Sequence, residues 1–112
     1  MTRAVGWGGA DEPWLSGHFT IGPEHPALAG HFPGNPVVPG VTVLQRVLAL
    51  VESAQPERTV ESVAEAKFLR PLRPAETCAV AIRRVDDRTL SFDCRVQQDL
   101  VARGILVLDG DN

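Results

Sequence analysis

The sequence predicts a single α+β domain in which an antiparallel sheet packs against one long, buried helix. Three observations lead to this fold class. An apolar segment with helical spacing begins at residue 40, four segments with alternating apolar and polar residues follow between residues 60 and 108, and one further strand-like segment precedes the helix. The chain has 112 residues, of which 44% are hydrophobic, so we expect one domain over residues 1–112.

The first part of the chain contains an arm, a strand and a loop. Residues 1–13 are rich in glycine and charge without apolar periodicity, which predicts a flexible N-terminal arm. Residues 14–21 alternate as a half-buried strand does, with Leu15, Phe19 and Ile21 on one side. Residues 22–39 contain five prolines, so we expect a long loop without regular structure. Loops of this length in compact domains usually serve a function.

The helix is predicted from residue 40 to about residue 55. Val41, Leu44, Leu48 and Val51 recur at helical spacing, and a second apolar row follows at Val43, Val47 and Leu50. A helix that is apolar on nearly every side is expected to be buried by its surroundings.

Four strands are predicted after the helix, over residues 60–68, 78–82, 90–96 and 100–108. A proline-containing break at 69–74 and short turns at 86–88 and 98–99 separate them. Cys78 and Cys94 lie in alternating segments and lack the spacing of a zinc site or a redox motif, so we expect two buried thiols and no metal.

Charge and hydropathy exclude several classes of partner. The net charge is −3 and the basic residues form no cluster longer than the pair Arg83 and Arg84, which argues against nucleic acid and anionic membranes. No segment reaches the ~18 consecutive apolar residues of a membrane span, and the N-terminus lacks the apolar core of a signal peptide. We therefore expect a cytoplasmic protein.

The most informative motif is GHFPGNPVVPG at residues 30–40, directly before the helix. It resembles the signature of the hotdog-fold 3-hydroxyacyl-acyl-carrier-protein dehydratases, His-Phe-Pro-Gly-x-Pro-x-x-Pro-Gly-Val, and the matching positions are His31, Phe32, Pro33, Gly34, Pro36, Pro39, Gly40 and Val41. The family has an acidic residue on the following helix, where this chain has Gln45. The stretch at 67–74 is also similar, but the family continues Pro-Gly-Asp and this chain has Pro74-Ala75-Glu76. The resemblance spans residues 14–108 and implies a hotdog fold.

Dehydration of a 3-hydroxyacyl thioester requires a base for the C2 proton, a hydrogen-bond donor for the thioester carbonyl and a proton for the departing hydroxyl. His31 is the candidate base, and its alternative role is a hydrogen bond to the loop backbone. The amide of Gly40 in the first turn of the helix is the candidate donor, unless this glycine serves loop geometry alone. Gln45 lies on the helix face of Val41 and Leu48, so we expect it to point inward at the second catalytic position. Its amide can donate a hydrogen bond but cannot deliver a proton.

The resemblance also implies binding residues and partners. Substrate-binding positions are Phe32, Pro39, Val41, Leu44 and Phe68, and a basic rim at Arg70 and Arg73 would contact an acidic acyl-carrier protein. The alternative for this rim is a solvated strand edge. No cofactor is implied, and we expect a homodimer or a heterodimer with a hotdog homologue that shares the site between subunits.

We therefore expect a dehydratase that acts on 3-hydroxyacyl thioesters in fatty-acid, polyketide or polyene synthesis. The main alternative is a non-catalytic hotdog subunit that binds acyl thioesters or pairs with an active homologue, with Gln45 as the sign of lost activity. A hotdog thioesterase is the third alternative, and the lack of an acidic residue from residue 41 to 51 counts against it.

Overall fold

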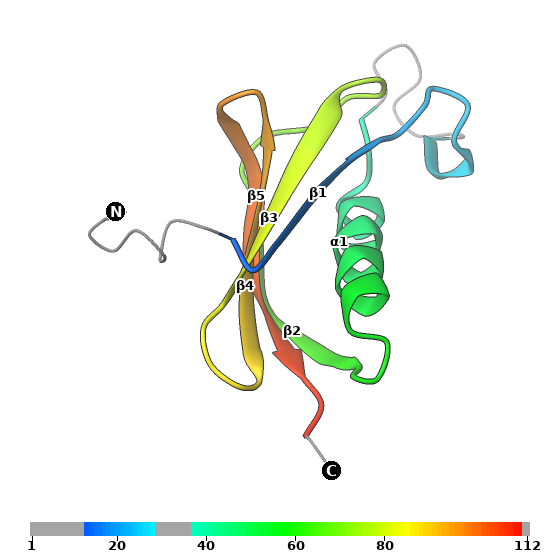
Figure 1. Cartoon of the computed structure of the whole chain (residues 1–112). Coiled ribbons are helices and arrows are strands. Elements are labelled where there is room, and N and C mark those ends of the chain that lie inside the picture. Colours follow the sequence, from blue (N-terminus) through cyan, green and yellow to red (C-terminus); the bar gives the residue numbers. More distant parts are fainter. Residues whose placement is uncertain (1–12, 29–36, 111–112) are drawn as a thin grey trace.

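The computed structural model describes residues 13–28 and 37–110, which form a five-stranded antiparallel sheet with one α-helix on one of its faces (Figure 1). The predicted α+β class is confirmed. The elements in chain order are β1 (Leu15–Thr20), the 3-10 helix η2 (Pro26–Leu28), α1 (Gly40–Ala54), β2 (Val60–Phe68), β3 (Thr77–Arg84), β4 (Thr89–Val96) and β5 (Asp99–Leu108).

The strand order in the sheet is β1-β3-β4-β5-β2, so β1 and β2 are its edges. The central strands β3, β4 and β5 form a meander of antiparallel neighbours. Asp86 closes the β3–β4 turn, where its carboxylate accepts a hydrogen bond from the backbone N–H of Arg88 at 2.9 Å. The β4–β5 turn lies at residues 97–98, one residue earlier than predicted, because Gln97 adopts a left-handed backbone with φ 56°.

The core lies between α1 and the inner face of the sheet. The helix contributes Val43, Val47 and Val51, which are at most 2% exposed. The central strands contribute side chains that alternate inward, as the sequence predicts: Cys78, Val80, Ile82, Leu90, Phe92, Cys94, Val96, Leu106 and Leu108. This period-two pattern gives β3 and β4 one buried and one accessible face.

The helix is buried on one side only, which corrects the prediction that it is buried on nearly every side. Val41 is 62% exposed, and Gln45 and Glu52 on the same face are also exposed. The reason is geometric, since a single sheet covers a single face of a helix and the described chain provides no second layer.

Strand β2 also differs from its prediction. We expect residues 60, 62, 64, 66 and 68 to form one buried face, but only Val60 and Ala66 are half-buried. Register shifts between Val60 and Ser62 and between Val63 and Glu65 break the strict alternation, and β2 has a neighbour on one side only.

The described parts of the predicted loop at 22–39 contain some local order. The chain forms η2, in which Leu28 is buried, and Val38 forms an isolated antiparallel bridge with Leu72. The bridge connects the segment before α1 to the β2–β3 connection.

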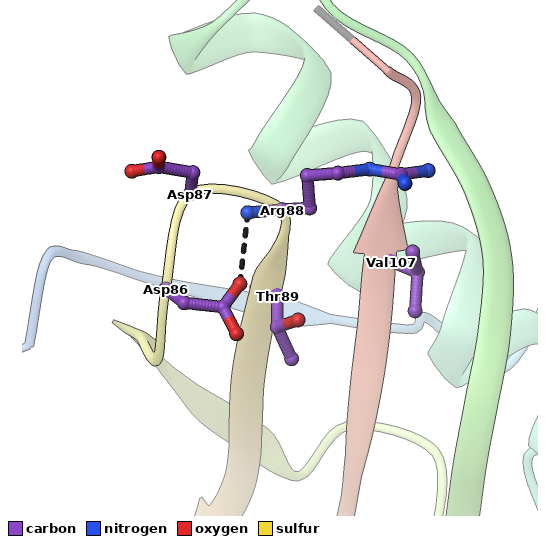
Figure 2. Close-up of a pocket in the computed structure, with 5 residues that line it drawn as sticks. All are labelled: Asp86, Asp87, Arg88, Thr89 and Val107. Carbon is purple, nitrogen blue, oxygen red and sulfur yellow. Dashed lines mark hydrogen bonds between the residues drawn. The ribbon is translucent and has the colours of Figure 1, made fainter.

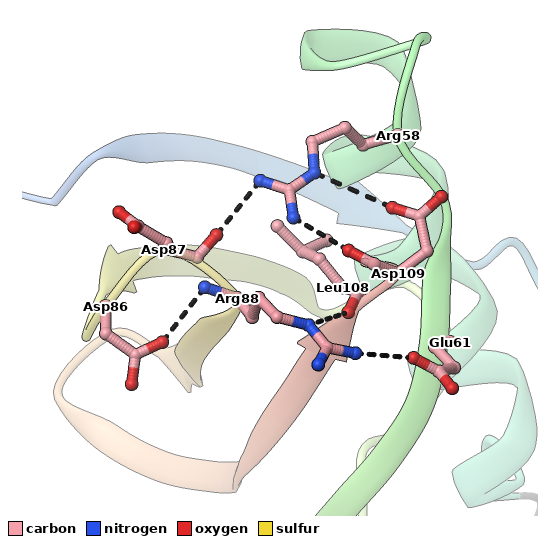
Figure 3. A network of polar contacts seen from close by, with 7 residues as sticks. All are labelled: Arg58, Glu61, Asp86, Asp87, Arg88, Leu108 and Asp109. Atoms are coloured by element: carbon pink, nitrogen blue, oxygen red, sulfur yellow. Dashed lines mark hydrogen bonds and ion pairs between the residues drawn. The ribbon is translucent and has the colours of Figure 1, made fainter. Parts of the chain in front are cut away.

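At the other end of the sheet, two arginines connect the β3–β4 turn to the end of β5 (Figure 3). Arg58 donates to the backbone carbonyls of Asp87 at 2.9 Å and Asp109 at 2.8 Å. Arg88 donates to the carbonyl of Leu108 at 3.2 Å and pairs with Glu61 at 2.8 Å. These contacts fix the end of the sheet remote from the start of α1.

Candidate functional site

The start of α1 presents two backbone amides that have no acceptor in the described part of the chain. The helix follows Pro39, whose backbone is extended (ψ 146°) and whose carbonyl accepts hydrogen bonds from Thr42 at 3.0 Å and Val43 at 3.3 Å. Within residues 13–28 and 37–110, no group accepts a hydrogen bond from the amides of Gly40 and Val41. Unpaired amides at the positive end of a helix dipole are suited to hold a negatively charged oxygen.

Backbone pairing holds this helix start in place. The N–H of Val38 donates to the carbonyl of Leu72 at 2.7 Å, and both side chains are buried. The carbonyl of Ile21 accepts a hydrogen bond from Ala75 at 2.8 Å, which ties the same β2–β3 connection to the end of β1. The amide of Gly40 therefore lies on a rigid support, as a preorganised donor must.

The ring of Phe68 lies directly against Gly40. A Cβ atom added at Gly40 would lie 2.9 Å from Cζ of Phe68 and 3.0 Å from its Cε2, so a side chain at this position would displace the ring. Phe68 is 47% exposed, so it forms part of the accessible surface at the start of α1. The structure thus brings together Gly40 and Phe68, with Pro39 and Val41 next to Gly40 in the chain.

His31 and Phe32 lie outside the described residues, so their roles as base and substrate contact stay predictions. Leu44 is half-buried one turn after Gly40. Leu44 therefore lies close to the start of the helix. Its contact with substrate stays a prediction.

Gln45 does not point into the core of its own chain, which corrects the expectation of an inward side chain. It is exposed, on the same face as Val41 and Glu52, whereas the buried face is that of Val43, Val47 and Val51. The apolar residues Val41 and Leu48 beside Gln45 made this face resemble a buried one in the sequence. A group that meets Gln45 must come from outside the described part of this chain.

Of the two arginines expected to contact a carrier protein, Arg70 already has a partner. Its guanidinium forms a two-point contact with Glu76, at 3.2 Å and 3.4 Å, and donates to the carbonyl of Pro71 at 2.7 Å. The backbone N–H of Arg73 donates to the Glu76 carboxylate at 2.8 Å. This hydrogen bond and the Arg70 guanidinium lower the pKa of Glu76. Arg70 is therefore engaged in holding the β2–β3 connection.

Cys78 and Cys94 are both free and fully buried, as predicted. A hydrogen bond with the Cys78 thiol and burial raise the pKa of Cys94, which keeps this thiol neutral. Over residues 13–28 and 37–110, no group of three or more His, Cys, Asp or Glu side chains could hold a metal ion. No helix in the same part of the chain has the length and apolar character to cross a membrane.

A hollow of about 570 Å³ lies at the β3–β4 turn, lined by Asp86, Asp87, Arg88, Thr89 and Val107 (Figure 2). It belongs to the polar end of the sheet that Arg58 and Arg88 hold together. Four of its five lining residues are charged or polar, so we take the start of α1 as the candidate site for an acyl thioester.

The fold belongs to the hotdog class, as comparison with solved structures shows. A chain of the dehydratase heterocomplex ApeI:P from Xenorhabdus doucetiae is 25% identical, with a TM-score of 0.76 over 85% of this chain and 86% of that chain. An uncharacterized protein from Erwinia carotovora subsp. atroseptica is 22% identical, with a TM-score of 0.71 over 84% and 81% of the two chains. The fluoroacetyl-CoA-specific thioesterase FlK shares the fold at 16% identity, with a TM-score of 0.58 over 85% and 90%.

The chain belongs to the ApeI-like family, described as ApeI dehydratase, whose family model matches residues 10–105. No curated protein is significantly similar to the sequence. The expected hotdog fold and the resemblance to hotdog dehydratases are thus confirmed.

Proposed function

We propose that this protein is a dehydratase that removes water from 3-hydroxyacyl thioesters carried by an acyl-carrier protein. The observation that carries the proposal is the start of α1 in a member of a dehydratase family: the amides of Gly40 and Val41 have no acceptor among the described residues, and the exposed Phe68 lies against Gly40. The thioester carbonyl would accept a hydrogen bond from the Gly40 amide, which stabilises the enolate-like charge that develops when C2 loses its proton. Phe68 would cover the thioester group and exclude water.

In this proposal His31 removes the C2 proton. A neutral imidazole can accept a proton near neutral pH, and the protonated ring can then return it to the departing hydroxyl. Gln45 would hold a water molecule or the substrate hydroxyl by a hydrogen bond, since an amide cannot supply the proton itself. Fatty-acid, polyketide and polyene synthesis all contain this reaction, and the heterocomplex of the relative is named as a dehydratase.

The exposure of Gln45 suggests that a second subunit completes the site. Val41 and Gln45 lie on the face of α1 that the described residues of its own chain leave uncovered. A homodimer or a heterodimer with a hotdog homologue would place this face against another chain, and the ApeI:P heterocomplex supports such an assembly. The second candidate function, a non-catalytic subunit, is favoured by Gln45 itself, because it stands where the dehydratases of the resemblance have an acid.

The test is hydration of crotonyl-N-acetylcysteamine, the reverse reaction on a small thioester, by the wild type and two variants. If His31 is the base, His31→Ala should lower turnover by ~10² or more with an unchanged circular dichroism spectrum. Gln45→Glu should raise turnover by ~10-fold or more, because a carboxyl group restores a proton donor.

Three other outcomes are informative. Unchanged turnover of His31→Ala would place the base elsewhere. A fast wild type that Gln45→Glu slows would mean that the enzyme uses the amide or a water at this position. If the wild type and Gln45→Glu are both inactive but still bind the thioester, the dehydratase proposal fails and the protein is a binding subunit.

A further inference from the structure

The face of the sheet opposite α1 carries an accumulation of positive charge. We define this outer face by the side chains of the four cations Lys67, Arg83, Arg95 and Arg103 and of the two carboxylates Glu65 and Asp93, which together line an open hollow of about 530 Å³. Figure 1 shows α1 on the other side of the sheet. Four cations against two carboxylates leave a local excess of positive charge on a chain whose net charge is −3.

Strand register places two of the cations directly opposite each other. Lys67 on β2 pairs with Arg103 on β5, and Arg103 pairs on its other side with Asp93 on β4. Like charges at directly opposite positions of an antiparallel pair destabilise the sheet. Within the described residues, neither Lys67 nor Arg103 forms an ion pair or a side-chain hydrogen bond.

The carboxylate of Asp93, which lies opposite Arg103, is already shared. Asp93 lies 3.6 Å from the guanidinium of Arg83 and 3.7 Å from that of Arg95, so it compensates two arginines at once. Asp93 therefore compensates little of the positive charge of Lys67 and Arg103. An external anionic group would relieve the repulsion between these two side chains.

The shape of the outer face also suits a macromolecular partner. A second open hollow of about 550 Å³ adjoins the first, and its lining includes the small residues Ser16, Ala79 and Ala81. Arg83, Asp93 and Arg95 line both hollows. The surface is thus a broad, shallow trough with long charged side chains around small ones, without the enclosed walls of a small-molecule site.

We propose that this outer face docks a partner protein through an acidic surface. A nucleic acid or an anionic membrane fits less well, because the rest of this net acidic chain would repel an extended polyanion. An acidic protein surface can place a few carboxylates against the cations of the outer face. The other, acidic surfaces of the two proteins then remain apart and do not repel each other strongly. The identity of this partner rests on the proposed function, in which an acyl-carrier protein carries the substrate. The partner is therefore the acyl-carrier protein.

The location agrees with delivery of a substrate to the start of α1. Lys67 and Phe68 are successive residues of β2, so their side chains point to opposite sides of the sheet. Phe68 contacts Gly40 on the helix side, whereas Lys67 belongs to the outer face. Only the exposed edge of the sheet at β2 separates the docking surface from the candidate site, and a flexible substrate arm could pass around it.

The test measures binding of a fluorescently labelled apo acyl-carrier protein to the full chain by anisotropy at low salt. Lys67→Glu should weaken binding by ~10-fold or more and reduce its salt dependence. The same substitution places opposite charges across β2 and β5, so it should raise the urea midpoint of unfolding. A gain in stability together with a loss of affinity excludes misfolding as the cause.

Arg46→Glu is the matched control, since it makes the same charge change at an exposed position on α1, on the other side of the sheet. It should change the affinity by less than about 2-fold, because a screened charge far from the contact has a small effect. The proposal is overturned if the wild type does not bind the carrier protein, or if Lys67→Glu weakens binding no more than Arg46→Glu. Hydration of crotonyl-N-acetylcysteamine involves no carrier protein, so it decides the proposed function independently.

Discussion

Ala75 carries a backbone conformation that its side chain disfavours. Its φ is 72°, in the left-handed region, and its N–H donates to Ile21 at 2.8 Å. The dehydratases that this chain resembles have glycine at the corresponding position, and glycine adopts this conformation without a steric penalty. The tertiary contact with Ile21 therefore holds Ala75 in a strained conformation at the β2–β3 connection.

We expect Ala75→Gly to stabilise the protein. Relief of the left-handed strain should add about 1–2 kcal/mol to the free energy of unfolding. The greater freedom of glycine in the unfolded chain should subtract about 0.4–1 kcal/mol. The net rise in the free energy of unfolding should therefore be about 0.5–1 kcal/mol. Urea unfolding measures the change. Ala79→Gly, at an exposed position within strand β3, is the control and should lower stability. Equal losses in both variants would show that Ala75 is unstrained.

At the scale of elements, the β2–β3 connection supports the start of α1. Val38 pairs with Leu72 in this connection, and Glu76 holds its turn through Arg70 and the N–H of Arg73. The carboxylate thus stabilises a connection on which the position of Gly40 depends.

Glu76→Gln should therefore lower the free energy of unfolding at pH 7 by about 0.5–1 kcal/mol, the range of an accessible charged hydrogen bond. The pKa of Glu76 is lowered in the folded state, so its contribution is present above the unfolded pKa and disappears as the pH falls through the folded value. The difference between wild type and variant should shrink below about pH 4, the usual range of a glutamate pKa. Urea titrations between pH 7 and pH 3 measure it.

Glu57→Gln is the control, because Glu57 is exposed and has no ion pair or side-chain hydrogen bond within residues 13–28 and 37–110. It should leave stability nearly unchanged at pH 7. A stability difference for Glu76→Gln that persists at pH 3 would rule out the carboxylate as its source.

At the scale of the whole molecule, the chain leaves an apolar region uncovered. Of the five exposed large hydrophobic side chains among residues 13–28 and 37–110, four lie at the first turn of α1, on β2 and just after it: Val41, Val63, Phe68 and Leu69. Strand β2 is also an edge, since no described strand pairs with its outer side. An exposed strand edge beside apolar side chains favours association with another chain.

We expect a dimer, so light scattering at micromolar concentration should give about twice the chain mass of 12.1 kDa. Replacing Val63 and Leu69 together by lysine should shift the mass toward the monomer, because edge lysines oppose strand pairing. Val85→Lys is the control, since Val85 is 59% exposed but follows β3 at the other end of the sheet. A wild-type monomer would contradict a homodimer and leave a heterodimer with a hotdog homologue to be tested by mixing.

The sequence alone determined the order of the elements, the start of the helix near Gly40, the turn at 86–88 and the burial of Cys78 and Cys94. These features follow from local rules, namely the periods of strands and helices and the backbone limits of proline and glycine. The motif at residues 30–40 was also enough to identify the family, because its prolines and glycines occur in a fixed order around one histidine.

Only the tertiary structure decided which face of α1 is buried, because apolar residues occur around most of the helix and the sheet covers one side. Strand register likewise placed Lys67 opposite Arg103, and packing brought Phe68 onto Gly40. The hydrogen bond from Ala75 to Ile21, which holds Ala75 at a positive φ, arises in the same way. The pairing of Lys67 with Arg103 and the contact of Phe68 with Gly40 join segments whose relative placement depends on the whole fold, so no local pattern in the sequence encodes them.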